Sequence, residues 1–198
     1  MPTQKEVRVE NSKDLLLLLL YTPGTTGGVN EPIRGKTRLT KLMFLFLTEY
    51  YKKFDFDKKI KHAPEFIPYK YGPFSKDVFE DLEFFENIGF VETTPEVVPE
   101  ISGAEIEELT RFNEEITIGS ASYESSSYEY EEEIYRLTGR GCEYAERLFS
   151  DLSKKQKDAL VQLKKKYGSV PLYALLEYVY NTYPDFAVKS EIRDRYLY

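Results

Sequence analysis

The chain has 198 residues with a formal net charge of -7, and 41% of them are hydrophobic, which excludes an intrinsically disordered polymer. At this length a single domain buries enough apolar surface to fold without disulfides or metal. One cysteine, Cys142, indicates a reducing compartment, and one histidine, His62, disfavours a histidine-rich metal site or a Cys–His nucleophile pair. We therefore expect a cytoplasmic protein with no cofactor and no metal.

Residues 12–53 predict two helices separated by a glycine-rich loop. Ser12 can cap a helix that continues through six leucines to Thr22, and this leucine run is too short to cross a membrane. We expect no membrane partner and interpret the run as a buried helix turn. The second helix is expected over 38–53, behind Thr37 as its cap, because apolar residues recur there at helical spacing: Leu39, Leu42, Met43, Phe46, Leu47 and Tyr50. A lysine-rich loop follows.

A third helix is predicted over residues 75–88, after a short extended piece that ends at Gly72-Pro73. Ser75 can cap it, and Gly89 can end it in a left-handed turn that leads directly into a strand at Phe90-Val91. Its apolar stripe is Val78, Phe79, Leu82, Phe85 and Ile88. We expect a common core formed by Leu42, Phe46, Val78, Leu82, Phe85 and Leu137.

The remainder of the chain combines an acidic stretch with three further helices. Residues 81–135 hold 16 acidic residues and one basic residue, whereas the segments before and after them are each net positive by four. Short β-prone pieces within this stretch, and a strand near residue 135, predict a hairpin. Beyond it, helical patterns predict helices at 139–150, 154–167 and 171–183. The wide apolar and aromatic stripe of the last helix suggests a homodimer interface.

The order helix, helix, short strand, helix, strand, hairpin arm, and a strand that leads into a helix is typical of a winged helix. Two motifs carry this interpretation: L-x-x-F-x-x-x-G-F-V at 82–91, and Y-R-L-T-x-x-G at 135–141. Thr138 can cap the helix that follows, while Tyr135 and Leu137 face the helices by strand alternation. We predict an α+β, mainly α fold. It consists of a winged helix-turn-helix over 1–150 with an elongated acidic wing at about 92–133, and a C-terminal helical extension over 151–198.

This order resembles winged-helix regulators of the PadR and MarR type. Three segments are also similar to a prokaryotic family of YwgA-like and, more distantly, Panacea (SocA-type antitoxin) proteins: G-K-T-R-L-T-K-L-M-F-L at 35–45, P-Y-K-Y-G-P-F-S-K-D-V at 68–78 and L-L-E-Y-V-Y-N-T-Y-P at 175–184. The resemblance implies a cytoplasmic, non-catalytic, winged-helix-like protein with a neutralising or regulatory role. It implies no catalytic residues.

The charge of the third helix favours a protein partner. A DNA reader places this helix in the major groove among phosphates. Here the polar positions are acidic: Asp77, Glu80, Asp81 and Glu83. We therefore predict an antitoxin-like regulatory protein in which these residues and the acidic wing bind a basic protein surface, such as that of a toxin or a nuclease.

The alternative is a DNA-binding transcriptional regulator that uses basic residues around 34–53. Lys36, Arg38 and Lys41 crowd the positive end of the second helix, where phosphate or an acidic surface can bind. Gly35-Lys36-Thr37 is not the end of a P-loop, because Asn30 stands where that motif requires glycine. The candidate nucleic-acid-binding residues are Arg34, Lys36, Arg38 and Lys41, with Lys52 and Lys53 nearby.

Overall fold

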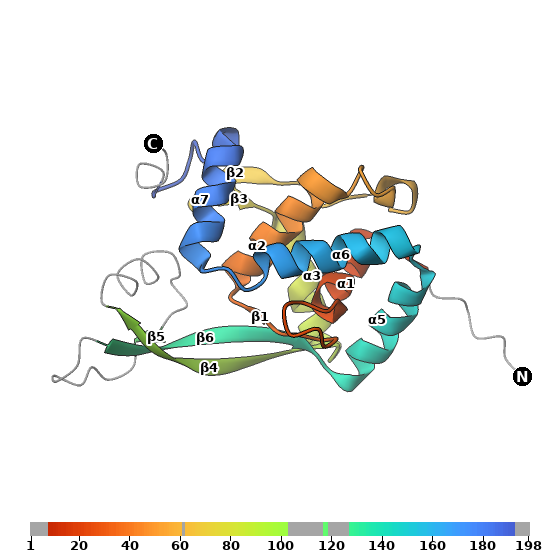
Figure 1. Cartoon of the computed structure of the whole chain (residues 1–198), viewed down its shortest axis with the longest axis horizontal. Helices are drawn as coiled ribbons and strands as arrows, with labels where there is room; N and C mark the ends of the chain where they lie inside the picture. Colours follow the sequence, from red (N-terminus) through yellow and green to blue (C-terminus); the bar gives the residue numbers. More distant parts are fainter. Residues whose placement is uncertain (1–7, 61, 103–116, 119–126, 193–198) are drawn as a thin grey trace, which may run out of the picture.

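The computed structural model describes residues 8–60, 62–102, 117–118 and 127–192 (Figure 1). The fold is α+β and mostly helical, with a small antiparallel sheet. Expected features within 103–116 and 119–126, which make up much of the acidic stretch, lie outside the described residues. Among the described helices, none is long and apolar enough to span a lipid bilayer.

The first helix, α1 (Ser12–Tyr21), is buried almost all round, as expected for its six leucines. It contacts α2, α3, α5 and α6. The cap is Asn11 rather than the predicted Ser12. The Asn11 side chain accepts from the Asp14 backbone N–H, and Asp14 accepts from the Asn11 N–H in return. This reciprocal capping box satisfies two donors at the buried helix end.

The second helix, α2 (Lys36–Leu45), continues as a π-helical turn at Phe46–Tyr50. Its N-cap is Gly35, and the predicted cap Thr37 is wrong because Thr37 lies within the first turn. Glu49 in the π turn accepts hydrogen bonds from three tyrosine hydroxyl groups in the C-terminal part of the chain: Tyr167 in α6, Tyr178 in α7 and Tyr183 directly after α7. These hydrogen bonds tie the end of α2 to the C-terminal extension.

The third helix, α3 (Lys76–Asn87), is followed by Gly89 in the left-handed conformation, with φ of 70°. The chain then enters β4 (Val91–Ser102), which pairs antiparallel with β6 (Ser127–Leu137). The strand β1 (Ile33–Arg34) pairs with the other edge of β6, which gives the order β1-β6-β4, and β5 (Thr117–Ile118) also pairs with β6. Figure 1 shows the β4–β6 hairpin extending away from the helices. A separate hairpin joins β2 (Ile67–Tyr69) and β3 (Gly72–Phe74).

The C-terminal half adds α5 (Gly139–Asp151), α6 (Lys154–Tyr167) and α7 (Leu172–Thr182), with α6 in contact with α1 and α2 (Figure 1). Thr138 caps α5 as predicted, accepting from the Gly141 backbone N–H at 3.2 Å. Gly141 belongs to the second motif for a steric reason. A Cβ at this position would lie 2.1 Å from the Phe90 carbonyl oxygen, so α5 approaches the β4 entrance too closely for any side chain.

The core agrees with the sequence. All six residues expected to be buried together are buried in one cluster: Leu42, Phe46, Val78, Leu82, Phe85 and Leu137. The apolar stripe of α7 also packs within the chain through Leu175, Leu176 and Val179, each at most 1% exposed. That helix therefore covers α2 and β3 of its own chain, and the homodimer stays a prediction.

Candidate protein-interaction surface

The helix α3 has one face in the core and one at the surface. Ser75 caps it, with its hydroxyl accepting from the Val78 backbone N–H at 3.4 Å. Val78, Leu82 and Phe85 recur every three or four residues and are buried against α1 and the sheet. Because a helix turns once in 3.6 residues, the positions between them face outwards. The burial of Val78, Leu82 and Phe85 therefore determines which residues of α3 face the solvent.

Three of the four predicted carboxylates lie on this exposed face: Asp77, Glu80 and Glu83. Glu80 forms an exposed ion pair with Lys76 at 2.6 Å. Asp77 accepts from the Glu65 backbone N–H at 3.2 Å, which joins the start of α3 to the segment before β2. With one lysine paired to one of three carboxylates, the face keeps a net negative charge.

The fourth carboxylate, Asp81, is not at the surface, so the expectation that it faces solvent is wrong. It is only 7% exposed. It accepts a hydrogen bond from the Ser12 hydroxyl at 3.1 Å and forms an ion pair with Lys13 at 3.2 Å. The reason is its position, since Asp81 precedes Phe85 by one turn and shares the stripe that packs against α1. Its charge holds two helices together.

The same surface carries apolar side chains that the sequence analysis did not identify as exposed. Phe84 is 43% exposed and Ile88, expected in the core stripe, is 36% exposed. A row of aromatic rings formed by Tyr69, Phe74 and Phe79 connects the β2–β3 hairpin to α3, with successive ring centres 5.0 Å apart. The carboxylates of α3 are thus bordered by exposed apolar groups. The signal in the sequence was the adjacent pair Phe84-Phe85, only one member of which fits the core stripe.

The predicted nucleic-acid-binding residues separate into two exposed or half-buried cations and two buried ones. Arg34 is exposed and forms an ion pair with Glu96 at 3.1 Å. Lys36 is half-buried, with its ammonium 5.2 Å from the centre of the Phe79 ring.

Arg38 and Lys41 are buried, at 8% and 3% exposure, so the expectation that they are available at the surface is wrong. The Arg38 guanidinium donates to the Val170 carbonyl, and the Lys41 ammonium donates to the Pro73 carbonyl at 2.9 Å. Burial lowers the pKa of Lys41 to about 7. The physical reason is that α2 is covered by α6, α7 and β3, so that its polar side chains end inside the fold.

A buried carboxylate faces this end of α2. Glu132 on β6 is 6% exposed, and burial raises its pKa, while the charges of Arg38 and Arg34 oppose that rise. Gly35 accommodates the carboxylate, because a Cβ there would lie 2.7 Å from the Glu132 Oε1 atom. The start of α2 therefore packs against β6 at Gly35 and Glu132, and two of its four candidate cations, Arg38 and Lys41, are not available at the surface.

Metal-ligating side chains do not cluster in the described part of the chain. No group of three or more His, Cys, Asp or Glu residues is placed to hold a metal ion there. Burial raises the pKa of the Cys142 thiol, and nearby Glu146 adds to that rise, so the thiolate is disfavoured. No protein-family model, curated protein or solved structure matches this chain.

Proposed function

We propose that residues 12–150 form a winged helix. Three helices (α1, α2, α3) precede the β4–β6 hairpin, and the short strand β1 between the first two helices completes its sheet, which supports this assignment; the separate β2–β3 hairpin is inserted between α2 and α3. In this proposal β4 and β6 form the wing, and α3 is the helix that a DNA-binding member would insert into the major groove. The family resemblance seen in the sequence agrees with the assignment and is part of the same proposal.

We propose that the protein is a non-catalytic, antitoxin-like regulatory protein that binds a basic protein partner through α3. The observation that carries this proposal is the charge of the exposed face of α3, where Asp77, Glu80 and Glu83 lie at the surface. Carboxylates at these positions would repel the phosphates of a groove, because such close contacts are only weakly screened by salt. The same carboxylates attract a cationic protein surface, such as the nucleic-acid-binding site of a toxin or nuclease.

The apolar border of α3 supports a protein partner over a simple cation. Tight protein interfaces place apolar anchors at the centre and charged groups at the rim. Phe84 and Ile88 can supply the anchors, and the carboxylates can steer association and give it salt dependence. We therefore expect the partner to present an apolar pocket surrounded by lysine or arginine side chains.

DNA reading through the start of α2 is the second candidate. It retains Arg34 and Lys36 but loses the two buried cations Arg38 and Lys41, so fewer phosphate contacts are available to it. A gel-shift titration with DNA from the promoter of its own gene tests it directly. Sequence-specific binding at nanomolar protein would contradict the protein-partner proposal in its present form.

The positive test uses charge reversal on α3. We expect the triple variant Asp77→Lys, Glu80→Lys, Glu83→Lys to lose a partner that the wild type captures from host extract, as measured by quantitative mass spectrometry. A matched control reverses three exposed glutamates elsewhere: Glu143, Glu146 and Glu177. Equal retention of every captured protein by the two triple variants would contradict the proposal.

A further inference from the structure

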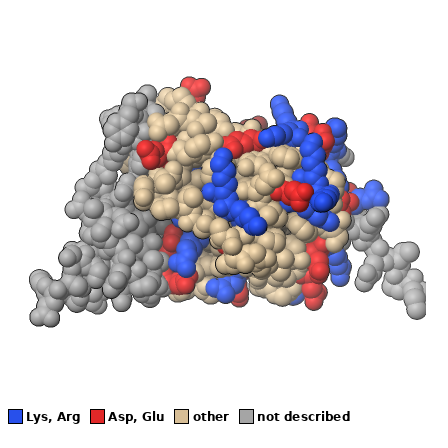
Figure 2. Space-filling model, in the orientation of Figure 1, with Lys and Arg blue, Asp and Glu red and all other residues tan. Residues whose placement is uncertain are grey.

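A second charged surface lies where α6 begins, far in sequence from α3. The segments 51–59 and 153–166 together hold ten lysines and three acidic residues. Figure 2 shows the resulting blue side chains gathered over α6 and the neighbouring turn, interspersed with a few red ones. Of these lysines, Lys164 is buried and Lys59 is paired with Asp151. We name five exposed lysines at this end of the molecule the lysine pole: Lys52, Lys53, Lys58, Lys154 and Lys155.

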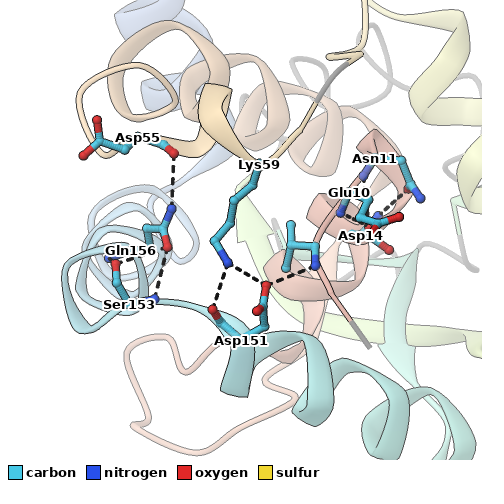
Figure 3. Close-up of polar contacts among 9 residues, drawn as sticks. Glu10, Asn11, Asp14, Asp55, Lys59, Asp151, Ser153 and Gln156 are labelled. Atoms are coloured by element: carbon cyan, nitrogen blue, oxygen red, sulfur yellow. Dashed lines mark hydrogen bonds and ion pairs between the residues drawn. The ribbon is translucent and has the colours of Figure 1, made fainter. Parts of the chain in front are cut away.

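Hydrogen bonds from Gln156 and Lys59, which are not among these five lysines, link the turn at 51–59 to the start of α6 and the end of α5 (Figure 3). Gln156 donates to the Asp55 carbonyl at 3.4 Å, and its own side chain closes a capping box with Ser153 at the start of α6. Lys59 donates to the Asp151 carbonyl at 2.9 Å and to its carboxylate at 2.6 Å. The backbone segments that carry the lysines are thus linked to each other by side-chain hydrogen bonds.

Phe54 shows how closely the two segments approach each other. The ammonium groups of Lys53 and Lys155, one from each segment, lie 5.4 Å and 5.5 Å from the centre of its ring. The ring is itself stacked on Tyr50, with 16° between the planes. Two like charges are therefore held around one aromatic group, an arrangement that a shared anion stabilises.

The α6 helix adds to the positive potential. It has 14 residues, so the partial positive charge of its N-terminus adds to those of Lys154 and Lys155, which occupy its first turn. The opposing charges are few: Asp55 pairs with Lys58 at 2.9 Å, and Asp57 and Asp158 are exposed nearby. Among the described residues, no ion pair involves Lys52, Lys53, Lys154 or Lys155. The lysine pole is therefore net positive and accessible.

Three classes of partner could bind a positive surface: an anionic membrane, an acidic protein and a nucleic acid. The side chains at the lysine pole favour one of them. A membrane-bound helix needs an apolar face directed at the lipid, but the apolar residues Ala159, Leu160 and Leu163 of α6 are buried in the core. A tight protein interface needs exposed apolar anchors, and none of the large exposed hydrophobic side chains of the described chain lies within 51–59 or 153–166. A surface that offers only ammonium groups fits the phosphate backbone of a nucleic acid, whose non-specific affinity is electrostatic.

We propose that the lysine pole binds the phosphate backbone of nucleic acid without sequence preference. The proposal is independent of the acidic surface on α3, with which it shares no residue. It also differs from DNA reading at the start of α2, because it needs no helix in a groove. Each ammonium group that contacts a phosphate releases counterions from the nucleic acid, so the affinity should fall steeply with salt.

The test is fluorescence anisotropy of a short labelled DNA duplex, in two unrelated sequences, titrated with the full-length protein at several salt concentrations. We expect equal affinity for both sequences. In the triple variant Lys53→Gln, Lys154→Gln, Lys155→Gln we expect at least about tenfold weaker binding at low salt, and a salt slope smaller by about 2–3, since each lost phosphate contact removes about 0.9. Circular dichroism melting establishes that the variant is folded.

The control variant Lys70→Gln, Arg147→Gln, Lys189→Gln removes the same charge from exposed positions elsewhere and should bind as the wild type does. An equal loss in both variants would show a net-charge effect and overturn the proposal, as would the absence of binding at low salt. Binding to polyglutamate or to vesicles of phosphatidylglycerol, without binding to DNA, would also overturn it. The α3 charge-reversal variant should bind the duplex at least as well as the wild type, so the two proposals fail separately.

Discussion

Replacing Lys164 with methionine should change how the stability of the protein depends on pH. Lys164 lies on α6 and is 2% exposed, and its ammonium donates to the Leu20 carbonyl at 2.9 Å and the Glu31 carbonyl at 2.7 Å. The first of these is among the last four carbonyls of α1, which lack partners within the helix. Burial lowers the pKa of Lys164 from 10.5 to about 7, with the charge of Glu31 opposing the change.

The sign follows from proton binding. Between pH 7 and pH 9 the unfolded chain keeps the Lys164 proton, whereas the folded chain has lost about half of it at pH 7 and nearly all of it at pH 9. Because the unfolded state then binds more protons, the free energy of unfolding rises with pH, by up to about 1.4 kcal/mol per pH unit. Integrated from pH 7 to pH 9, the free energy of unfolding of the wild type rises by about 2 kcal/mol from this residue. Methionine does not titrate, so Lys164→Met removes this rise.

Urea denaturation followed by circular dichroism at pH 7, 8 and 9 measures the effect. The difference in free energy of unfolding between wild type and Lys164→Met should grow by about 2 kcal/mol in favour of the wild type from pH 7 to pH 9. Lys165→Met, on the adjacent exposed residue, is the matched control and should keep the wild-type pH profile. Parallel profiles for Lys164→Met and the wild type would refute the reasoning, because they would mean that the buried amine keeps an ordinary pKa.

Three further substitutions test the packing, each measured by urea denaturation at pH 7. Gly141→Ala should destabilise the fold by at least about 2 kcal/mol, because its Cβ would overlap a carbonyl oxygen, whereas Gly139→Ala, which has no atom within 4 Å, should not. Glu49→Gln weakens hydrogen bonds from three tyrosines and should cost about 2 kcal/mol, and an unchanged stability would remove its linking role. Phe85→Ala should cost about 3–5 kcal/mol and exposed Phe84→Ala under about 1 kcal/mol; equal costs would contradict the assigned core.

The helices and the core were readable from sequence because both depend on local periodicity. Apolar residues at helical spacing predicted α2 and α3, and the six expected core residues are all buried. Local chemistry also predicted the left-handed turn at Gly89 and the cap at Thr138. In each case the information lies within a few residues of the position, where spacing and side-chain type are sufficient.

Tertiary structure decided which polar residues are buried. Arg38 and Lys41 look like surface cations in the sequence, but α6, α7 and β3 cover them, and Asp81 is covered by α1 in the same way. Lys164 is buried within a run of lysines in which it looks like its neighbours. The strand β1 exists because β6 pairs with it from about 100 residues away. Periodicity specifies which residues share a face, whereas the elements that cover that face come from distant parts of the chain, so the charges left at the surface are set by packing.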